Sequence, residues 1–125
     1  MQMDSDAVES DKIRMKFVTG GSDSRALIWS LDESKITLET ELKTENYRGF
    51  VRSISWSQNI LLPYELISVG CESKIVEVHK CIESKWTYET IKGLSGCVWC
   101  LDWSLTGNML SVSCGESNVA IYSVI

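Results

Sequence analysis

Short runs of alternating apolar and polar residues recur along the chain, separated by small clusters of glycine, serine and charged residues. The runs are rich in valine, isoleucine, threonine and tryptophan. Alternation with a period of two, bounded by turn-forming residues, is typical of half-buried β-strands. The pattern therefore predicts an all-β protein made of short antiparallel strands.

The runs belong to an internal repeat. FVTGGSDSRALIW at 17–29 aligns without gaps to ISVGCESKIVEVH at 67–79 and to LSVSCGESNVAIY at 110–122, and each segment reads as strand, tight turn, strand. VRSISWS at 51–57 likewise matches VWCLDWS at 98–104. The intervals lie close to the roughly 40–45 residues of a four-stranded WD repeat, and an insertion around Leu62, Pro63 and Tyr64 lengthens the longest one. The repeat predicts a partial WD-repeat β-propeller.

We expect about two and a half blades in a propeller segment at 16–125: a partial blade at 16–43, a complete blade at 51–92 and a partial blade at 98–123. The expected strands are 16–19, 26–30, 37–43, 51–57, 65–69, 74–80, 86–92, 98–104, 109–113 and 118–123. Residues 1–15 are polar and acidic without a period, which predicts a flexible tail. Since propellers close with about four to eight blades, another chain or the rest of a longer one must supply the remainder.

The charge balance, 12 basic against 17 acidic residues, argues against nucleic acid or an anionic membrane surface as a partner. No apolar stretch is long enough for a membrane helix, and the acidic start does not resemble a signal peptide, so we expect a cytoplasmic protein. The five cysteines lie in strand-like runs, which predicts buried free thiols in a reducing compartment.

Several motifs within these runs are more specific than a generic WD repeat. They are Val51, Arg52 and Trp56 in one strand, the Leu-Pro insertion at Leu62 and Pro63, a run at Trp103, Ser104, Thr106, Asn108 and Leu110, and the final Val112, Ser113 and Gly115. Over about residues 16–123 their order and spacing resemble the C-terminal half of the Sec-thirteen family. That family is the WD-repeat subunit of the COPII vesicle coat and of the nuclear-pore outer ring.

The resemblance implies a non-enzymatic structural scaffold that supports ER-to-Golgi vesicle transport and pore assembly. It implies an open propeller completed in trans by an elongated helical coat protein or nucleoporin. It also implies a location on the cytoplasmic side, reaching the endoplasmic reticulum and vesicle membrane only through the coat, or at the nuclear pore. No cofactor and no small-molecule substrate are expected. A generic WD adaptor in signalling or ubiquitin transfer is the alternative function.

The chain departs from WD repeats at the polar contact that commonly joins a histidine before the inner strand to an aspartate in the central turn. The histidine positions hold Tyr47 and Leu94, and the turn positions hold Asp23, Ser73 and Glu116. We therefore expect this contact to be absent or weak, which leaves apolar packing to hold the blades together.

Two sets of residues are candidates for a site. His79, Cys81, Cys97 and Cys100 form a low-ranking zinc alternative, because the Cys-x-x-Cys pair lies on an expected strand, where residues three apart point to opposite faces. His79 aligns with Trp29 and Tyr122, which favours a packing role. No catalytic residue is expected. For the partner interface, we predict the aromatic residues Trp86, Tyr88 and Trp99, because the tryptophans on the other strands read as packing between blades.

Overall fold

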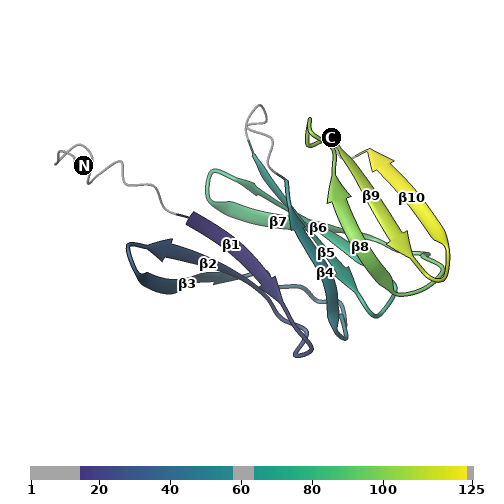
Figure 1. Cartoon of the computed structure of the whole chain (residues 1–125), viewed down its shortest axis with the longest axis horizontal. Coiled ribbons are helices and arrows are strands. Elements are labelled where there is room, and N and C mark those ends of the chain that lie inside the picture. Colours follow the sequence, from purple (N-terminus) through teal and green to yellow (C-terminus); the bar gives the residue numbers. More distant parts are fainter. Residues whose placement is uncertain (1–14, 58–63, 124–125) are drawn as a thin grey trace.

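The computed structural model describes residues 15–57 and 64–123, which form antiparallel β-strands joined by turns (Figure 1). The strands are β1 (Met15–Gly20), β2 (Ala26–Asp32), β3 (Lys35–Glu41), β4 (Val51–Trp56), β5 (Glu65–Cys71), β6 (Val76–Ile82), β7 (Lys85–Ile91), β8 (Val98–Trp103), β9 (Met109–Cys114) and β10 (Asn118–Ser123). Each expected strand is present. The predicted tail lies outside the described residues except for Met15, which begins β1, and so do Leu62 and Pro63 of the insertion.

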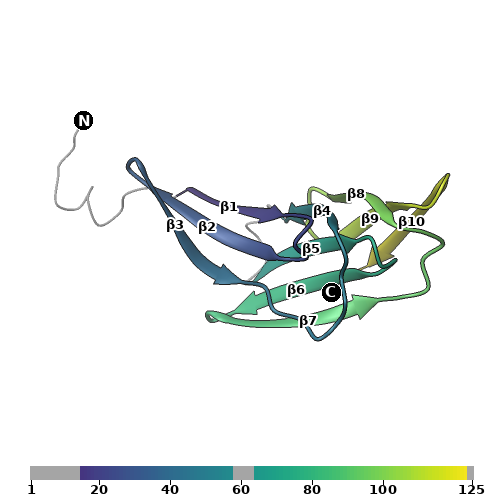
Figure 2. The same ribbon diagram turned by 90° about the horizontal axis from the view of Figure 1, so that it is seen from below.

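The strands form three sheets. Sheet 1 has the order β1-β2-β3, sheet 2 the order β4-β5-β6-β7 and sheet 3 the order β8-β9-β10. Strand β4 lies beside both β1 and β8, so that the inner part of sheet 2 contacts sheets 1 and 3 (Figure 2). An all-β chain with three antiparallel sheets of three or four strands is consistent with partial WD-repeat blades. Within the described residues, no helix is long and apolar enough to cross a membrane.

Sheet 2 packs on both of its faces, which is why its strands carry apolar residues beyond a simple alternation. One face builds a core with sheet 1 that includes Ile67 and Val69, and the other builds a core with sheet 3 that includes Leu66 and Val78. Neighbouring residues of β5 thus serve opposite cores, as the period of two requires. The three sheets lie face to face with sheet 2 in the middle.

Two predicted strands are displaced by two residues at both ends, and the strands expected at 26–30 and 65–69 each run two residues further. Lys74 was expected to begin a strand, but it has a φ of 71° in the turn before β6, which begins at Val76. The strand expected at 37–43 runs from Lys35 to Glu41, directly after the turn residue Glu33, whose φ is 58°. Non-glycine residues with positive φ occur mainly in tight turns, where the chain reverses too sharply for strand geometry.

Glycines allow the sheets to approach closely at two equivalent positions of the repeat. A Cβ atom on Gly20 would collide with the side chain of Val51, and one on Gly70 would lie 2.5 Å from Cγ1 of Val98. Each valine begins the inner strand of the next sheet. In sheet 3 the equivalent position of the repeat holds Ser113. No described sheet covers the outer face of sheet 3.

Candidate functional site

A buried polar network joins sheet 1 to sheet 2. The Arg48 guanidinium, in the link between β3 and β4, lies 2.8 Å from Oε1 of Glu77 in β6, and both side chains are buried. The same guanidinium donates to the main-chain oxygens of Ser24 at 3.1 Å and Leu42 at 2.6 Å. His79 lies with its Nε2 2.9 Å from Oε1 of Glu77. One arginine therefore ties the turn and the end of sheet 1 to the middle of sheet 2.

This network corrects the expectation that the blades are held together without a polar network. Tyr47 and Leu94 do not supply the contact, but Arg48, the residue after Tyr47, does. Its acceptor Glu77 aligns with Leu27 and Ala120 in the other repeats. The acceptor therefore lies on a strand, whereas the usual aspartate lies in the turn. Comparison with the usual histidine and aspartate positions missed it because both partners lie elsewhere.

The electrostatics of the network favour the charged form of Glu77. Burial by itself would raise the pKa of this carboxyl group, but hydrogen bonds from His79 and Arg48 outweigh burial and lower the pKa to about 2. A carboxylate held in this way stays ionised at neutral pH, where its negative charge compensates the positive charge of Arg48. The network serves to position the two sheets.

The structure does not assemble the zinc alternative. His79 is buried beside Glu77, whereas Cys100 is exposed on β8 of another sheet. Cys81 lies on β6 with His79, and Cys97 lies in the link before β8. Within the residues that the structure describes, no three histidine, cysteine or acidic side chains are placed to hold a metal ion.

An aromatic cluster surrounds Arg52 at the start of the inner strands. Arg52 and Trp99 are each the extra residue of a β-bulge, in β4 and β8 respectively. The Arg52 guanidinium carbon lies 5.3 Å from the ring centre of Phe50 and 5.4 Å from that of Trp99, and Arg52 also pairs with Glu72 at 3.3 Å. Trp99 remains 54% exposed, although its indole nitrogen donates to the oxygen of Gly115. Bulges turn these two side chains out of the strand ladder.

The other two predicted interface residues face the interior. Trp86 packs against the core between sheets 1 and 2, and Tyr88 stacks on His79 with 5.2 Å between ring centres. The Tyr88 hydroxyl accepts a hydrogen bond from the amide of Glu45. Their contacts in this chain join sheet 2 to the end of sheet 1, and their role at a partner interface stays a prediction, as does that of Trp99.

The outer face of sheet 1 carries two cross-strand rows of apolar side chains. The rows follow the strand register and are Met15, Leu31 and Ile36 in one, and Phe17, Trp29 and Leu38 in the other. Four of these side chains are exposed large hydrophobics, with Met15 61% and Ile36 58% exposed. Cross-strand rows of this kind normally pack against another layer. No described part of the chain covers them.

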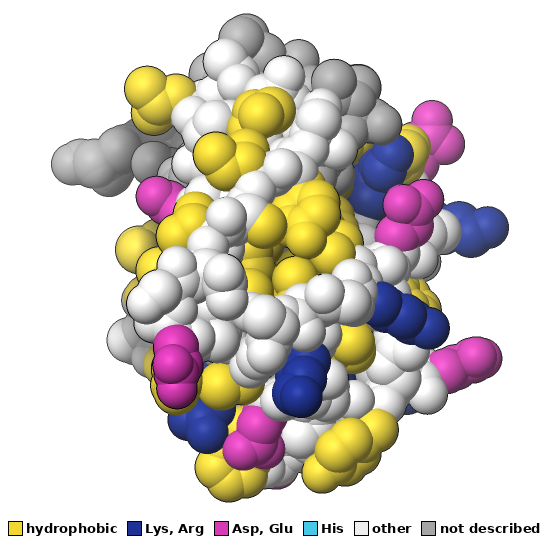
Figure 3. Space-filling view, turned by 90° about the vertical axis from the view of Figure 1, so that its right-hand side faces the viewer, with side chains coloured by type: hydrophobic (Ala, Val, Ile, Leu, Met, Phe, Trp, Pro, Cys, Tyr) yellow, Lys and Arg dark blue, Asp and Glu magenta, His cyan; other side chains and the backbone are white. Residues whose placement is uncertain are grey.

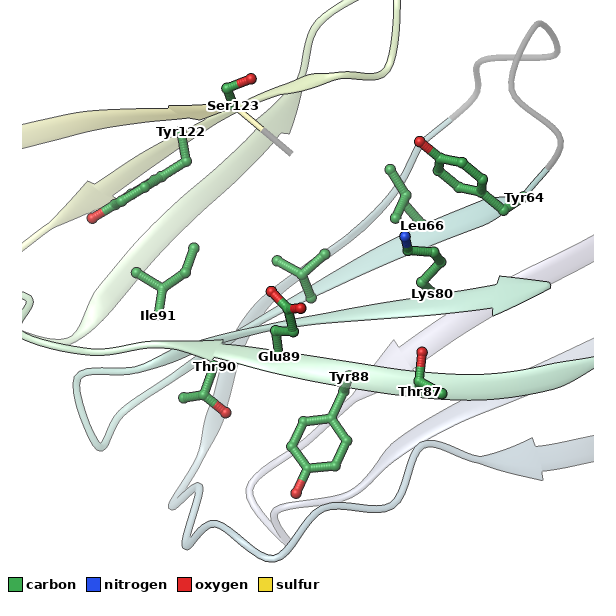
Figure 4. Close-up of a pocket in the computed structure, with 11 residues that line it drawn as sticks. Tyr64, Leu66, Lys80, Thr87, Tyr88, Glu89, Thr90, Ile91, Tyr122 and Ser123 are labelled. Carbon is green, nitrogen blue, oxygen red and sulfur yellow. The ribbon is translucent and has the colours of Figure 1, made fainter. Parts of the chain in front are cut away.

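A groove separates β7 of sheet 2 from β10 of sheet 3. It encloses about 300 Å³ and is lined by residues from both sheets, among them Ile91 and Tyr122. Seen from the end that carries β10, apolar side chains surround a hollow in the middle of the surface (Figure 3). Tyr122 reaches from β10 toward Ile91, whereas Tyr88 and Thr90 project from the opposite side of β7 (Figure 4).

Comparisons with known proteins agree with the three-sheet fold. The chain is 31% identical over 118 residues to "Protein transport protein SEC13" of Cryptococcus neoformans var. neoformans, with 86% of this chain covered. It is 32% identical over 108 residues to "Protein SEC13 homolog" of Dictyostelium discoideum and 31% identical over 109 residues to that of Drosophila melanogaster. The chain belongs to the SEC13 family. No family model matches it.

The relation to SEC13 is partial in length. The chain spans 36% of the Cryptococcus protein, 35% of the Dictyostelium protein and 30% of the Drosophila protein, or about a third. The resemblance found from the motifs is therefore confirmed at the level of the family. In this shared third, one sheet is packed on both faces and lies between two sheets that each keep one open face.

Sequence reasoning identified the strands but did not specify which residues form the open surfaces. Leu38 lies within the strand expected at 37–43 and Ile36 directly before it, yet no signal indicated that they face solvent while Trp86 and Tyr88 face the core. The alignment of the repeats indicates the face on which each residue lies. Residues at equivalent positions point toward the preceding sheet, and sheet 1 has no preceding sheet among the described residues.

Proposed function

We propose that this chain is a non-catalytic scaffold segment that acts in protein transport by binding other proteins. More specifically, it takes part in a COPII-type vesicle coat at the endoplasmic reticulum and in assembly of the nuclear-pore outer ring. The relatives named as protein transport proteins support the transport role. The apolar outer face of sheet 1 is the observation that supports action by protein contact.

The partner is an elongated helical coat protein or nucleoporin that contributes a blade in trans. A strand layer from that partner would cover the exposed rows on sheet 1, and burying such side chains stabilises a complex by about 25 cal/mol for each Å² of apolar surface removed from water. The segment reaches the membrane through this partner and does not bind lipid itself. Its place is therefore the cytoplasmic side of vesicle and endoplasmic-reticulum membranes, or the pore.

Co-expression tests the proposal. The whole chain is produced with a helical coat protein that carries a blade-insertion segment, and the mixture is analysed by size-exclusion chromatography with light scattering. We expect a stoichiometric complex that the double substitution Phe17→Ser with Leu38→Ser disrupts, because both residues lie in one exposed row. Val119→Ser is the matched control, since Val119 is 70% exposed but lies on the outer face of sheet 3. A complex insensitive to the double substitution would contradict binding at sheet 1.

A second candidate is a WD adaptor in signalling or ubiquitin transfer, favoured by the aromatic cluster of Phe50, Arg52 and Trp99. Exposed tryptophan and arginine are common in protein interfaces. Trp99→Ala separates the two functions, because it removes the exposed ring of the cluster and leaves the sheet 1 face unchanged. Loss of coat-protein binding in this variant, with binding retained in the Phe17→Ser, Leu38→Ser protein, would favour the adaptor.

A further inference from the structure

The aromatic cluster of Phe50, Arg52 and Trp99 lies between sheets 2 and 3, at the end of the fold where β4 and β8 begin. The turn after β5 reaches the same place. The amide of Glu72 donates to the main-chain oxygen of Phe50 at 2.9 Å, and the amide of Phe50 donates to Oε1 of Glu72 at 3.3 Å. These two hydrogen bonds fix the Glu72 carboxylate beside the cluster.

The Arg52 side chain is held in one orientation. Its guanidinium carbon lies 5.3 Å from the ring centre of Phe50 and 5.4 Å from that of Trp99. The Trp99 ring is itself fixed, because its indole nitrogen donates to the main-chain oxygen of Gly115 at 2.6 Å. On one side, Nη2 of Arg52 donates to Oε2 of Glu72 at 3.3 Å. A guanidinium held in this way loses little conformational freedom when it binds a ligand.

The cluster offers hydrogen-bond donors to a ligand and not acceptors. A guanidinium carries five N–H groups, and among the described residues only Glu72 accepts from Arg52. Both carboxylate oxygens of Glu72 already have a donor, and so does the oxygen of Gly115. A fitting ligand must therefore supply the acceptors. A carboxylate is suited to this, because its two oxygens accept two parallel N–H groups of one arginine.

The two rings add apolar surface beside these donors. Trp99 is 54% exposed and Phe50 is 44% exposed. An extended chain presents side chains on one face at every second residue, about 6.6 Å apart. This spacing is close to the distances between the Arg52 guanidinium and the two rings. An acidic residue placed on Arg52 would therefore bring the residue two positions away onto a ring.

We propose that the aromatic cluster is a docking site for an extended segment of another protein, which carries an acidic residue and an apolar residue two positions away. The carboxylate pairs with Arg52, and the apolar side chain packs on Trp99 or Phe50. A carboxylate suits the site better than a phosphate group. Glu72 lies 3.3 Å from the same guanidinium, and it repels a dianion more strongly than a monoanion.

This inference rests on the second candidate function, the WD adaptor, and names the chemistry of its ligand. The cluster is separate from the outer face of sheet 1, which carries the proposed scaffold function. Its binding is measured with peptides and without a coat protein. Failure of peptide binding would therefore leave the coat-protein result unchanged, and a chain that ignores the coat protein could still bind the peptides.

An array of seven-residue peptides tests the chemistry of the ligand. Each peptide has glutamate, glutamine or phosphoserine at its centre, and leucine, phenylalanine or serine two positions away. We expect the whole chain to bind the peptides with glutamate and an apolar residue at least about tenfold more tightly than their glutamine counterparts. Replacing the apolar residue by serine should also weaken binding. Fluorescence anisotropy of labelled peptides measures the affinities, which should fall as the salt concentration rises.

Variants of the chain locate the bound peptide. Arg52→Gln should weaken binding of the glutamate peptides at least about tenfold. Arg25→Gln is the matched control, because Arg25 is also an exposed arginine paired with a glutamate, Glu41 at 3.5 Å, and lies in the turn before β2. Glu72→Gln keeps an acceptor for the Phe50 amide and removes a competing negative charge. It should therefore strengthen binding by about two- to fivefold, whereas a merely structural role of Glu72 would predict weaker binding.

Circular dichroism confirms that each variant keeps its strands. Three results would overturn the proposal: equal binding of the glutamate and glutamine peptides, equal losses in Arg52→Gln and Arg25→Gln, or no binding of any peptide. Tighter binding of the phosphoserine peptides would also overturn it, because a phosphorylated segment would then be the ligand.

Discussion

Arg48 and Glu77 form a buried ion pair of 2.8 Å between sheet 1 and sheet 2. The equivalent residues at the junction between sheets 2 and 3 are Ser95 and Ala120, so no second pair of this kind holds that junction. There the corresponding polar contact is a hydrogen bond of 2.7 Å from Asn118 to Ser95 on exposed side chains. Both junctions have an apolar core, and the junction between sheets 1 and 2 contains a buried charge pair in addition.

Removing one partner of the buried pair should be more harmful than removing both. Glu77→Ala leaves the Arg48 charge buried without compensation, and we expect it to lower the free energy of unfolding by roughly 3–5 kcal/mol. The double variant Arg48→Met with Glu77→Leu replaces the pair by apolar side chains and should be much closer to wild type. Urea denaturation of the three proteins measures the difference. A double variant as unstable as Glu77→Ala would show that the pair itself is not the cause.

The same carboxyl group predicts a pH dependence. The pKa of Glu77 is about 2 in the folded protein, below the ordinary value of 4.5 for a glutamate, so the folded state holds this proton more weakly than the unfolded state. The resulting stability, about 3 kcal/mol, is fully present above pH 4.5 and is lost as the pH falls toward 2. Unfolding free energies at pH 7, 4.5 and 3 test this, with Glu77→Gln as the control for the other carboxylates. Equal acid sensitivity in both proteins would refute the assignment.

Sequence periodicity predicted the strands well and the junctions poorly. Each repeat has its own alternation, which local side-chain burial imposes, so β5 and β6 could be read from ISVGCESKIVEVH directly. The Arg48–Glu77 contact joins residues 29 positions apart through a link with no periodic pattern. Its only sequence signal was a carboxylate at a position where the sister repeats carry Leu27 and Ala120.

The cysteines should react with thiol reagents in an order set by burial. Burial, together with the nearby carboxylate of Glu77, raises the pKa of the Cys71 thiol to about 12. Cys100 is exposed on β8. Because the thiolate is the reactive form, a reagent at mildly alkaline pH should modify Cys100 first and leave Cys71 unmodified while the chain stays folded. Mass spectrometry after timed quenching measures the order, and modification of Cys71 as fast as Cys100 would indicate that the core between sheets 1 and 2 opens readily.

The close approach of sheets 2 and 3 at Gly70 gives a prediction with a matched control at the equivalent position of the next repeat. Gly70→Val places a side chain where Cγ1 of Val98 would lie 2.5 Å from the new Cβ and Cδ1 of Leu101 3.1 Å from it. Overpacking of this kind costs about 1–3 kcal/mol, and strand β8 must move away from β5 to relieve it. Ser113→Val makes the equivalent change on the outer face of sheet 3 and should alter stability by less than about 0.5 kcal/mol. Thermal unfolding of both variants distinguishes contact between sheets from a general effect of valine in a strand. If Ser113→Val were as destabilising as Gly70→Val, the outer face of sheet 3 would already be covered in solution, for example by a second copy of the chain.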